Sequence, residues 1–372
     1  MNPRIPSTLN PVDLLTRVNR DVERSMLRAR NGIRYVRGTH RPALGVTPKD
    51  VVWKRDRAEL WRYRSEQPIR WSQPVLIVHS LVSRSYILDL RPGSSHVEFL
   101  LNEGFDVYML DWGVADERDA DNSFETYVDE YLPRAVAAAL EESGVSELTL
   151  SGYCLGGLFA ILYAAAYDDA PVRNVVLLAT PVDFSQMGAM VAAVREGRLN
   201  TPELLDETGN VPPDALYSGF YMQAPTKEIA QYATLLENLW NDEFVEAYQA
   251  MAQWSREHVP LPGAATRQIV DDLIRRNVLM TGSWRLGGRD IELGAVRANV
   301  LNAVAEKDNV VPRPVSAPVM ELVGAPERRE ELLLSGGHVT FGAGSHAFKR
   351  TLPALSQWLA AHSDELDPPK ER

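Results

Sequence analysis

Short apolar runs alternate along most of the chain with segments whose apolar residues recur at helical spacing. Runs typical of buried strands lie at residues 74–79, 106–111, 147–151, 174–179, 299–305 and 329–334. Helical spacing occupies segments between and after them, for example residues 124–142, 155–168 and 345–361. Strands that are apolar throughout and joined by helices are typical of a parallel sheet covered on both faces. The pattern therefore predicts an α/β fold with a mostly parallel sheet.

This alternation stops between residues 184 and 288, where helical patterns rich in Trp and Met predict a mostly helical cap (lid). Near the start, residues 12–30 place Leu14, Val18, Val22 and Met26 at every fourth position, which predicts an amphipathic helix. Its apolar stripe packs either on the body of the protein or on a partner. The expected organisation is an N-terminal helical segment (1–70), the first part of the core (71–183), the cap (184–288) and the second part of the core (289–372).

Composition narrows the class of protein. The 372 residues are 45% apolar and 24% charged, a mixture typical of a globular chain and not of a disordered one. A net charge of −11 argues against a general nucleic-acid binder. Residues 1–40 have a net charge of +5, which hints at a docking segment, although a solvated helix face is the simpler interpretation. No apolar run approaches the roughly 18 residues that span a membrane, and no signal-peptide core is visible, so we expect a cytoplasmic protein.

The strongest candidate for chemistry is the segment Gly152-Tyr-Cys-Leu-Gly-Gly157, which contains the only cysteine of the chain. A predicted strand precedes it and a predicted helix follows, as in a nucleophile elbow, with Cys154 in the place of the usual serine. The glycines let neighbouring backbone pass close to a strained turn. A helix N-terminus favours the thiolate. A buried structural cysteine is the alternative. One cysteine excludes a disulfide framework and every Cys-cluster metal site.

A thiol nucleophile needs a base, and the base needs an acid that orients it. In this fold they follow the nucleophile in the order acid, then histidine, each after a strand. Asp308 follows the strand at 299–305, with Glu306 as a competitor, and His338 follows the strand at 329–334. Among the seven histidines, only His338 lies in a Gly-Gly turn after a late strand. The sequence therefore predicts a Cys154, Asp308, His338 triad.

Acyl transfer also needs donors for an oxyanion. We expect one to be the backbone N–H of Leu155, directly after the nucleophile. The second is expected from Leu81 or Val82, in the loop after the strand at 74–79. His79, at the start of that loop, is expected to support loop packing and not catalysis.

Several motifs together resemble the catalytic subunit of polyhydroxyalkanoate synthases, especially the short type that works with a second, smaller subunit. They are Thr47-Pro-Lys-Asp-Val-Val-Trp with Ala58-Glu-Leu-Trp-Arg-Tyr63, Tyr86-Ile-Leu-Asp-Leu-Arg-Pro-Gly93, Asp106-Val-Tyr-Met-Leu-Asp-Trp-Gly113, Gly152-Tyr-Cys-Leu-Gly-Gly157, Gly287-Gly-Arg, Asp308-Asn-Val-Val-Pro312 and Gly336-Gly-His338. The resemblance extends from about residue 47 to residue 361. It implies an α/β-hydrolase fold with a cap.

The resemblance also implies an activity: polymerisation of (R)-3-hydroxyacyl-CoA, with short groups such as 3-hydroxybutyryl favoured, through an acyl-cysteine and with release of coenzyme A. Coenzyme A enters as part of the substrate, and no cofactor or metal is expected. The expected partners are the growing polyester chain, a smaller synthase subunit and a second copy of the chain in a homodimer. The expected location is the surface of polyester storage granules in the cytoplasm. Neither a nucleic acid nor a membrane span is expected.

Three positions depart from the family pattern. Asn309 stands where the family usually has His, Ser83-Arg84 replaces its usual Asn and basic residue, and Trp254 lacks the Asp that usually follows. The main competing function is a Cys-nucleophile hydrolase similar to dienelactone hydrolase, or a thioesterase. Dienelactone hydrolases have a nearly identical Gly-Tyr-Cys-Leu-Gly-Gly segment but much shorter chains without a large cap. A non-catalytic binding module on the same scaffold would be expected to lack a triad member, and all three are present.

Overall fold

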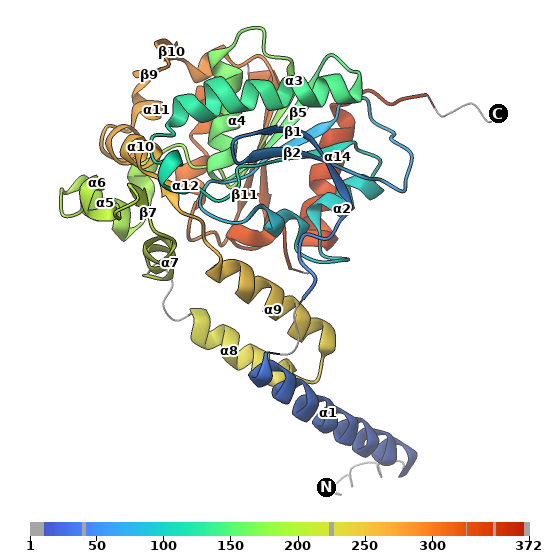
Figure 1. Cartoon of the computed structure of the whole chain (residues 1–372). Coiled ribbons are helices and arrows are strands. Elements are labelled where there is room, and N and C mark those ends of the chain that lie inside the picture. Colours follow the sequence, from blue (N-terminus) through green and yellow to red (C-terminus); the bar gives the residue numbers. More distant parts are fainter. Residues whose placement is uncertain (1–10, 39–41, 223–226, 325, 345–346, 368–372) are drawn as a thin grey trace, which may run out of the picture. The chain divides into compact units, whose positions relative to one another are not determined.

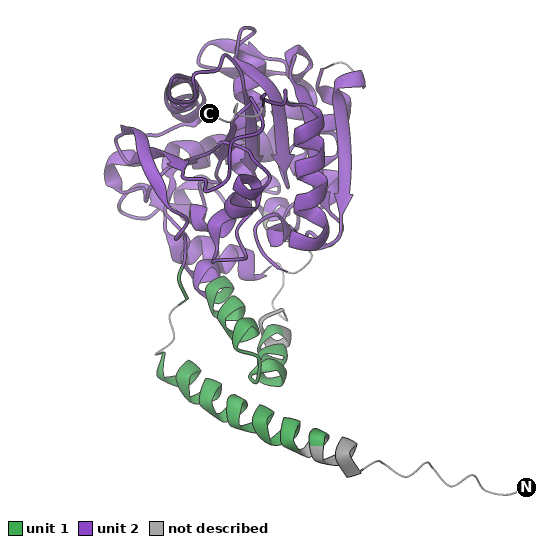
Figure 2. Cartoon of the chain, turned by 90° about the vertical axis from the view of Figure 1, so that its right-hand side faces the viewer, with its two compact units in different colours: residues 1–43, 225–252 green, residues 44–224, 253–372 purple. Residues whose placement is uncertain are grey.

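A computed structural model describes residues 11–38, 42–222, 227–324, 326–344 and 347–367 (Figure 1). The chain divides into two compact units, residues 1–43 with 225–252 and residues 44–224 with 253–372 (Figure 2). This division differs from the expected one, because the middle of the predicted cap groups with the N-terminal helix. The ends of the chain and residues 345–346, where the last predicted helix begins, lie outside the described residues.

The larger unit is built on a sheet of eight strands in the order β1-β2-β4-β3-β5-β6-β11-β12. From β4 to β12 all neighbours are parallel, whereas β1 and β2 pair antiparallel at one edge. The strands are β1 (Lys49–Arg55), β2 (Ala58–Tyr63), β3 (Val75–Val78), β4 (Val107–Asp111), β5 (Leu148–Tyr153), β6 (Val172–Leu178), β11 (Asn299–Ala305) and β12 (Arg329–Leu334). The predicted parallel sheet is confirmed. Strands β1 and β2, which lie within the expected N-terminal segment of residues 1–70, are part of this sheet.

Burial explains which strands lie inside. Every residue of β3 and β5 is buried, as expected where helices cover both faces of a parallel sheet. The edge strands β1 and β12 consist of exposed and half-buried positions apart from the buried Leu334, and they carry charged side chains, which discourage pairing with another chain. Helices α3 and α4 lie on one face of the sheet, and α2 and α14 on the other (Figure 1).

The helices of this unit are α2 (His96–Asn102), α3 (Leu132–Ser143), α4 (Leu155–Ala166), α5 (Ala189–Arg195), α6 (Thr201–Leu204), α7 (Pro213–Met222), α10 (Gly263–Gln268), α11 (Val278–Thr281), α12 (Arg313–Ser316), α13 (Val319–Leu322) and α14 (Leu352–Ala361). Two small antiparallel pairs interrupt the helical region, β7 (Asn210–Val211) with β8 (Leu261–Pro262), and β9 (Trp284–Leu286) with β10 (Arg289–Ile291). The region after β6 is therefore mostly helical, as predicted.

The smaller unit consists of α1 (Pro11–Arg37), α8 (Lys227–Asn238) and most of α9 (Asp242–Arg256). Helix α1 contains the predicted amphipathic segment and continues beyond it. Among the described residues, no helix combines the length and the apolar composition that crossing a membrane requires.

Candidate active site

Cys154 occupies the sharp turn between β5 and α4. Its backbone has φ 55° and ψ −120°, a conformation that costs energy for any residue other than glycine. The residue is 8% exposed and forms the N-cap of α4, a helix of 12 residues. The amide dipoles at that end favour a negative charge on sulfur. The fold therefore presents the thiol in a strained turn that suits a nucleophile.

Three glycines make the turn possible because neighbouring atoms, mostly of the backbone, occupy the space of a side chain. A Cβ on Gly152 would lie 2.2 Å from the Cα of Gly157, and one on Gly156 would lie 2.1 Å from the carbonyl oxygen of Val78. On Gly157 it would lie 1.8 Å from the hydroxyl oxygen of Thr180. None of these distances is compatible with a side chain, so the glycines fix how closely α4 approaches β3 and β5.

The predicted acid and base meet at the ends of β11 and β12, which pair in parallel. The Nδ1 of His338 donates to Oδ2 of Asp308 at 2.8 Å, and the Asp308 side chain is fully buried. The other oxygen, Oδ1, accepts from the amides of Val310 and Val311, both at 2.8 Å. The carboxylate is thus fixed by its own turn. Glu306, the competing carboxylate, accepts from Ser335 at 3.4 Å and not from His338.

The imidazole of His338 links the acid to the thiol, since its second nitrogen is left for a hydrogen bond with Cys154. Burial lowers the pKa of this imidazole, but the Asp308 carboxylate and the Cys154 thiol outweigh that effect and raise the pKa of His338 to about 10. A second histidine fixes the same turn: Nδ1 of His96 donates to the carbonyl oxygen of Phe341 at 2.7 Å. The arrangement favours the protonated form of His338 beside the sulfur of Cys154.

The three predicted oxyanion donors lie at the ends of two adjacent strands. Leu155 is the first residue of α4, and the first N–H groups of a helix have no acceptor within it. Leu81 and Val82 follow β3, whose Val78 pairs with Gly152 of β5, so their loop and the elbow lie side by side. This placement is compatible with a shared oxyanion, and the role of these residues stays a prediction.

Hydrogen bonds fix both ends of the loop from residue 79 to 83. Since a carbonyl only accepts, Nε2–H of His79 donates to the carbonyl oxygen of Ser83 at 2.7 Å. The indole Nε1–H of Trp112 donates to the carbonyl oxygen of His79, also at 2.7 Å. Burial lowers the pKa of His79 to about 4, so its ring is neutral and keeps this donor at neutral pH. These contacts agree with the expected packing role of His79.

The C-terminal end of α9 and the residues directly after it contact the next part of the same loop. Nε1–H of Trp254 donates to the carbonyl oxygen of Arg84 at 2.9 Å, and His258 forms a β-bridge with Ser83. The hydroxyl of Tyr86 donates to Glu257 at 2.8 Å. Two departures from the family pattern, at Arg84 and Trp254, therefore contact each other. The third, Asn309, is exposed beside Asp308.

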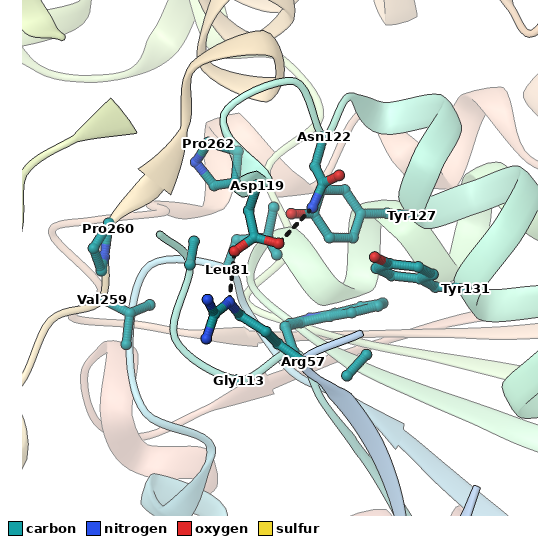
Figure 3. A pocket seen from close by; sticks show the side chains of 13 residues that line it. Arg57, Leu81, Gly113, Asp119, Asn122, Tyr127, Tyr131, Val259, Pro260 and Pro262 are labelled. Atoms are coloured by element: carbon teal, nitrogen blue, oxygen red, sulfur yellow. Dashed lines mark hydrogen bonds and ion pairs between the residues drawn. The ribbon is translucent and has the colours of Figure 1, made fainter. Parts of the chain in front are cut away.

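A small cavity of about 20 Å³ lies behind this loop (Figure 3). Its walls include Leu81, Trp112 and Tyr127 as well as an ion pair in which Nε of Arg57 contacts Asp119 at 2.8 Å. This volume holds about one water molecule. The cavity is therefore too small for an acyl group.

The sequence predicted the candidate triad, but it did not predict most of the residues that contact the loops around it. Trp112 was noted only as part of the Asp-Trp-Gly motif, and Trp254 only as a departure from the family. Both tryptophans donate to backbone carbonyl groups, which have no signature in a sequence. The sequence offered only one general indication: the N–H group of a buried tryptophan needs a hydrogen-bond acceptor.

Two profiles of protein families match the chain. One, described as alpha/beta hydrolase fold, matches residues 73–344, and the other, described as the N-terminus of poly-beta-hydroxybutyrate polymerase (PhaC), matches residues 15–100. The structure of a thermophilic esterase from Thermogutta terrifontis is 15% identical, with a TM-score of 0.50, and the match covers 85% of this chain and 100% of that one. At this identity the likeness shows the fold alone.

Two relatives are named poly(3-hydroxyalkanoate) polymerase subunit PhaC. The protein from Haloferax mediterranei is 32% identical over 324 residues, which are 87% of this chain and 65% of the relative. The protein from Allochromatium vinosum is 32% identical over 318 residues, which are 85% of this chain and 89% of the relative. The profile over residues 73–344 shows that the chain has an α/β-hydrolase fold. The identity and coverage show that it belongs to the family of poly(3-hydroxyalkanoate) polymerase subunits PhaC.

Proposed function

We propose that the chain is a catalytic subunit that polymerises (R)-3-hydroxyacyl groups, short ones such as 3-hydroxybutyryl, from their coenzyme A thioesters. The observation that carries this proposal is the alignment of the Cys154 thiol, the His338 imidazole and the Asp308 carboxylate in a chain of this family. Coenzyme A enters as part of the substrate, and the proposal needs no metal or further cofactor.

In the first half of the reaction, the thiol of Cys154 gives its proton to Nε2 of His338, and the thiolate attacks the carbonyl carbon of the thioester. The amides of Leu155 and of Leu81 or Val82 stabilise the oxyanion. The bond from carbon to the sulfur of coenzyme A then breaks, and the departing thiolate takes the proton from His338. One thioester replaces another, so the acyl-enzyme forms with little change in free energy.

In the second half, the 3-hydroxyl of another acyl group attacks the acyl carbon on Cys154. His338 accepts the hydroxyl proton, while Asp308 holds the imidazole in the tautomer that can do so. The carbon–sulfur bond to Cys154 breaks, an oxygen ester remains, and the proton returns to the sulfur. The ester is more stable than the thioester, which drives the chain to grow.

The partners follow from the same family relation. Since the relatives are named subunits, we propose that a smaller second subunit assists the chain and that the chain works at the surface of polyester granules in the cytoplasm. We also propose that two copies of the chain form a homodimer. Fluorescent tagging in a polyester-accumulating cell tests the location: diffuse fluorescence during accumulation would contradict it.

The decisive experiment measures coenzyme A release from 3-hydroxybutyryl-CoA by the purified chain, with sizing of the product, with and without a candidate small subunit. Release together with a high-mass polyester supports the proposal. Release together with free 3-hydroxybutyrate contradicts it and favours the cysteine hydrolase or thioesterase, which would use the same triad with water as acceptor.

Cys154→Ser is the matched variant, because it keeps the volume of the side chain but not the acidity of the thiol. We expect it to lose nearly all coenzyme A release, whereas Asn309→His, at an exposed position beside Asp308, should keep it within about threefold. A Cys154→Ser protein with turnover close to the unmodified chain would refute the assignment of the nucleophile.

A further inference from the structure

The residue before the nucleophile, Tyr153, contacts the candidate base. It is the last residue of β5 and is 2% exposed. Its hydroxyl donates to the carbonyl oxygen of His338 at 3.2 Å. The rings of the two residues lie 5.3 Å apart between their centres, at an angle of 40°. One side chain at the elbow therefore contacts both the backbone and the ring of His338.

This hydrogen bond connects parts of the sheet that are not adjacent. Cys154 follows β5, whereas His338 follows β12, and the strands β6 and β11 lie between these two strands. The separation of the sulfur and the imidazole therefore depends on how the intervening strands twist, unless a side chain bridges them. Tyr153 provides such a bridge, because it belongs to the strand that leads to the nucleophile and binds the turn that carries the base.

The turn that carries His338 needs contacts from outside, because its own backbone restricts it little. Two glycines directly precede the histidine, and the first, Gly336, has a φ of 131°, which L side chains rarely adopt. The carbonyl oxygen of Gly336 accepts from the amide of Lys307 at 2.8 Å, and Asp308 holds the imidazole. Both of these contacts come from the loop after β11. The hydrogen bond from Tyr153 adds a contact from β5, the strand of the elbow.

The ring of Tyr153 also contacts the loop that is predicted to supply an oxyanion donor. The ring of His79 lies 6.3 Å from it between centres, at an angle of 19°, so the two rings are nearly parallel. Packing therefore fixes the ring of Tyr153 beside two histidines, and its hydroxyl is engaged by a carbonyl group. Tyr153 is thus placed to act through His338 and not on the substrate.

We propose that Tyr153 is a positioning residue, which holds the imidazole of His338 beside the sulfur of Cys154 through its hydrogen bond to the carbonyl oxygen of His338. This role rests on the proposed function, in which His338 takes a proton first from the thiol and then from the 3-hydroxyl group. Both transfers need Nε2 within hydrogen-bond reach of the proton. A looser turn places the imidazole correctly for less of the time, which slows the reaction without changing how the thioester binds.

Tyr153→Phe is the first test, because it removes the hydroxyl and keeps the ring. We expect the turnover number for coenzyme A release from 3-hydroxybutyryl-CoA to fall about tenfold, while KM changes less than about twofold. Tyr108→Phe is the matched control. Tyr108 is fully buried near the start of β4, far from the carboxyl ends of the strands, and its hydroxyl donates to Asp106, also at 3.2 Å. This control should keep the turnover number of the unmodified chain.

Tyr153→Leu separates the role of the hydroxyl from that of the ring. It removes both, so we expect a lower melting temperature than for Tyr153→Phe, but most of the loss in turnover should already be present in the Phe variant. Turnover is measured well below the melting temperature of each variant, so that lower stability alone does not reduce it. If Tyr153→Phe keeps its turnover and only Tyr153→Leu loses it, the ring serves packing and the proposal is wrong.

Proton NMR gives a second readout, which does not depend on turnover. In a chain labelled with nitrogen-15 histidine, the Nδ1–H proton that His338 donates to Asp308 is assigned by its absence from His338→Gln. We expect this proton to exchange with water several-fold faster in Tyr153→Phe, because a looser turn opens more often, and at the unmodified rate in Tyr108→Phe.

The two readouts separate this proposal from the proposed function. An unchanged exchange rate in Tyr153→Phe, or an unchanged turnover number, would each overturn the positioning role. If the unmodified chain released no coenzyme A at all, the proposed function would fail, and the exchange rate would still decide whether Tyr153 holds His338 in place.

Discussion

The elbow at Cys154 and the helical unit of residues 1–43 and 225–252 hold a helix in place by different means. At the elbow, α4 is almost wholly buried, and its backbone lies against that of β3 without room for a Cβ. In the helical unit, α1 is held along one face by an ion pair, hydrogen bonds and ring contacts, and its other face is exposed. The first region is set by steric exclusion and should tolerate little change. The second is set by charge and should respond gradually to substitution and salt.

Gly156→Ala should have the largest effect. Its Cβ would lie 2.1 Å from the carbonyl oxygen of Val78 and 2.6 Å from that of His79, so β3 or α4 must shift. We expect a loss of about 3 kcal/mol in the free energy of unfolding, or no folded protein, and coenzyme A release reduced at least about a hundredfold. Gly188→Ala, where nothing lies within 4 Å of a Cβ, is the matched control. Normal melting and activity of Gly156→Ala would show that the elbow is not sterically determined.

Asp308→Asn keeps the shape of the acid but removes its charge. The amide nitrogen would face Nδ1 of His338 and favour the tautomer with its proton on Nε2, which cannot accept a proton from Cys154. We expect the turnover number for coenzyme A release to fall about a thousandfold, by analogy with other triads. Glu306→Gln is the control, and it should leave turnover nearly unchanged. The assignment of the acid fails if these two results are exchanged.

The same pair makes stability depend on pH. The folded-state pKa of His338 is raised to about 10, so the pair contributes fully below the unfolded value of about 6.5. The contribution is lost as the pH rises through about 10. The difference in unfolding free energy between the unmodified chain and Asp308→Asn should therefore shrink steadily between these values. Urea unfolding at several pH values measures it, and a difference that stays constant or grows would contradict the charged imidazole.

His79 should have a moderate effect, because it positions the loop with Leu81 and Val82 and does not touch the reacting atoms. His79→Leu removes the bond to Ser83, and we expect turnover to fall about thirtyfold while KM changes little. His79→Gln, which can still donate to a carbonyl, should recover part of the loss. Equal loss in both variants, or an effect on KM alone, would indicate a role in packing only.

Asp242→Asn in the helical unit should have the smallest effect. Arg30 and Asn31 both donate to Asp242, and the hydrogen bond from Arg30 is the main reason why the pKa of this carboxyl is lowered. Because both partners of the ion pair are about half exposed, we expect at most about 1 kcal/mol, and less at high salt. Thermal melting at low and high salt measures this. A large loss that is independent of salt would show that this unit is held as rigidly as the elbow.

The sequence predicted the buried strands well because parallel strands in a covered sheet are mostly apolar. The strand expected at 299–305 is β11 with the same bounds. Strands β1 and β2 were missed, since Lys49–Arg55 and Ala58–Tyr63 mix charged and apolar residues without a regular period. The grouping of residues 225–252 with the N-terminal helix was also missed, because contacts between distant segments leave no local pattern.

In the candidate site, too, some features could be predicted from the sequence and others could not. The order of nucleophile, acid and base along the chain led to Asp308 and His338, which the fold brings within 2.8 Å of each other. The contacts from Trp112 and Trp254 to backbone carbonyl groups were not predictable, since any residue provides such an acceptor. Side chains that suit a chemical role can thus be recognised in a sequence, whereas hydrogen bonds to backbone carbonyl groups depend on the path of the backbone.

The position of the single cysteine at the elbow has a practical consequence. Every mole of an alkylating reagent that the folded chain consumes reports on one atom, the sulfur of Cys154. Mass spectrometry of the labelled chain then counts competent centres in a preparation without any substrate. The rate of labelling as a function of pH records the ionisation of that sulfur directly, so a single reagent serves both as titrant and as probe.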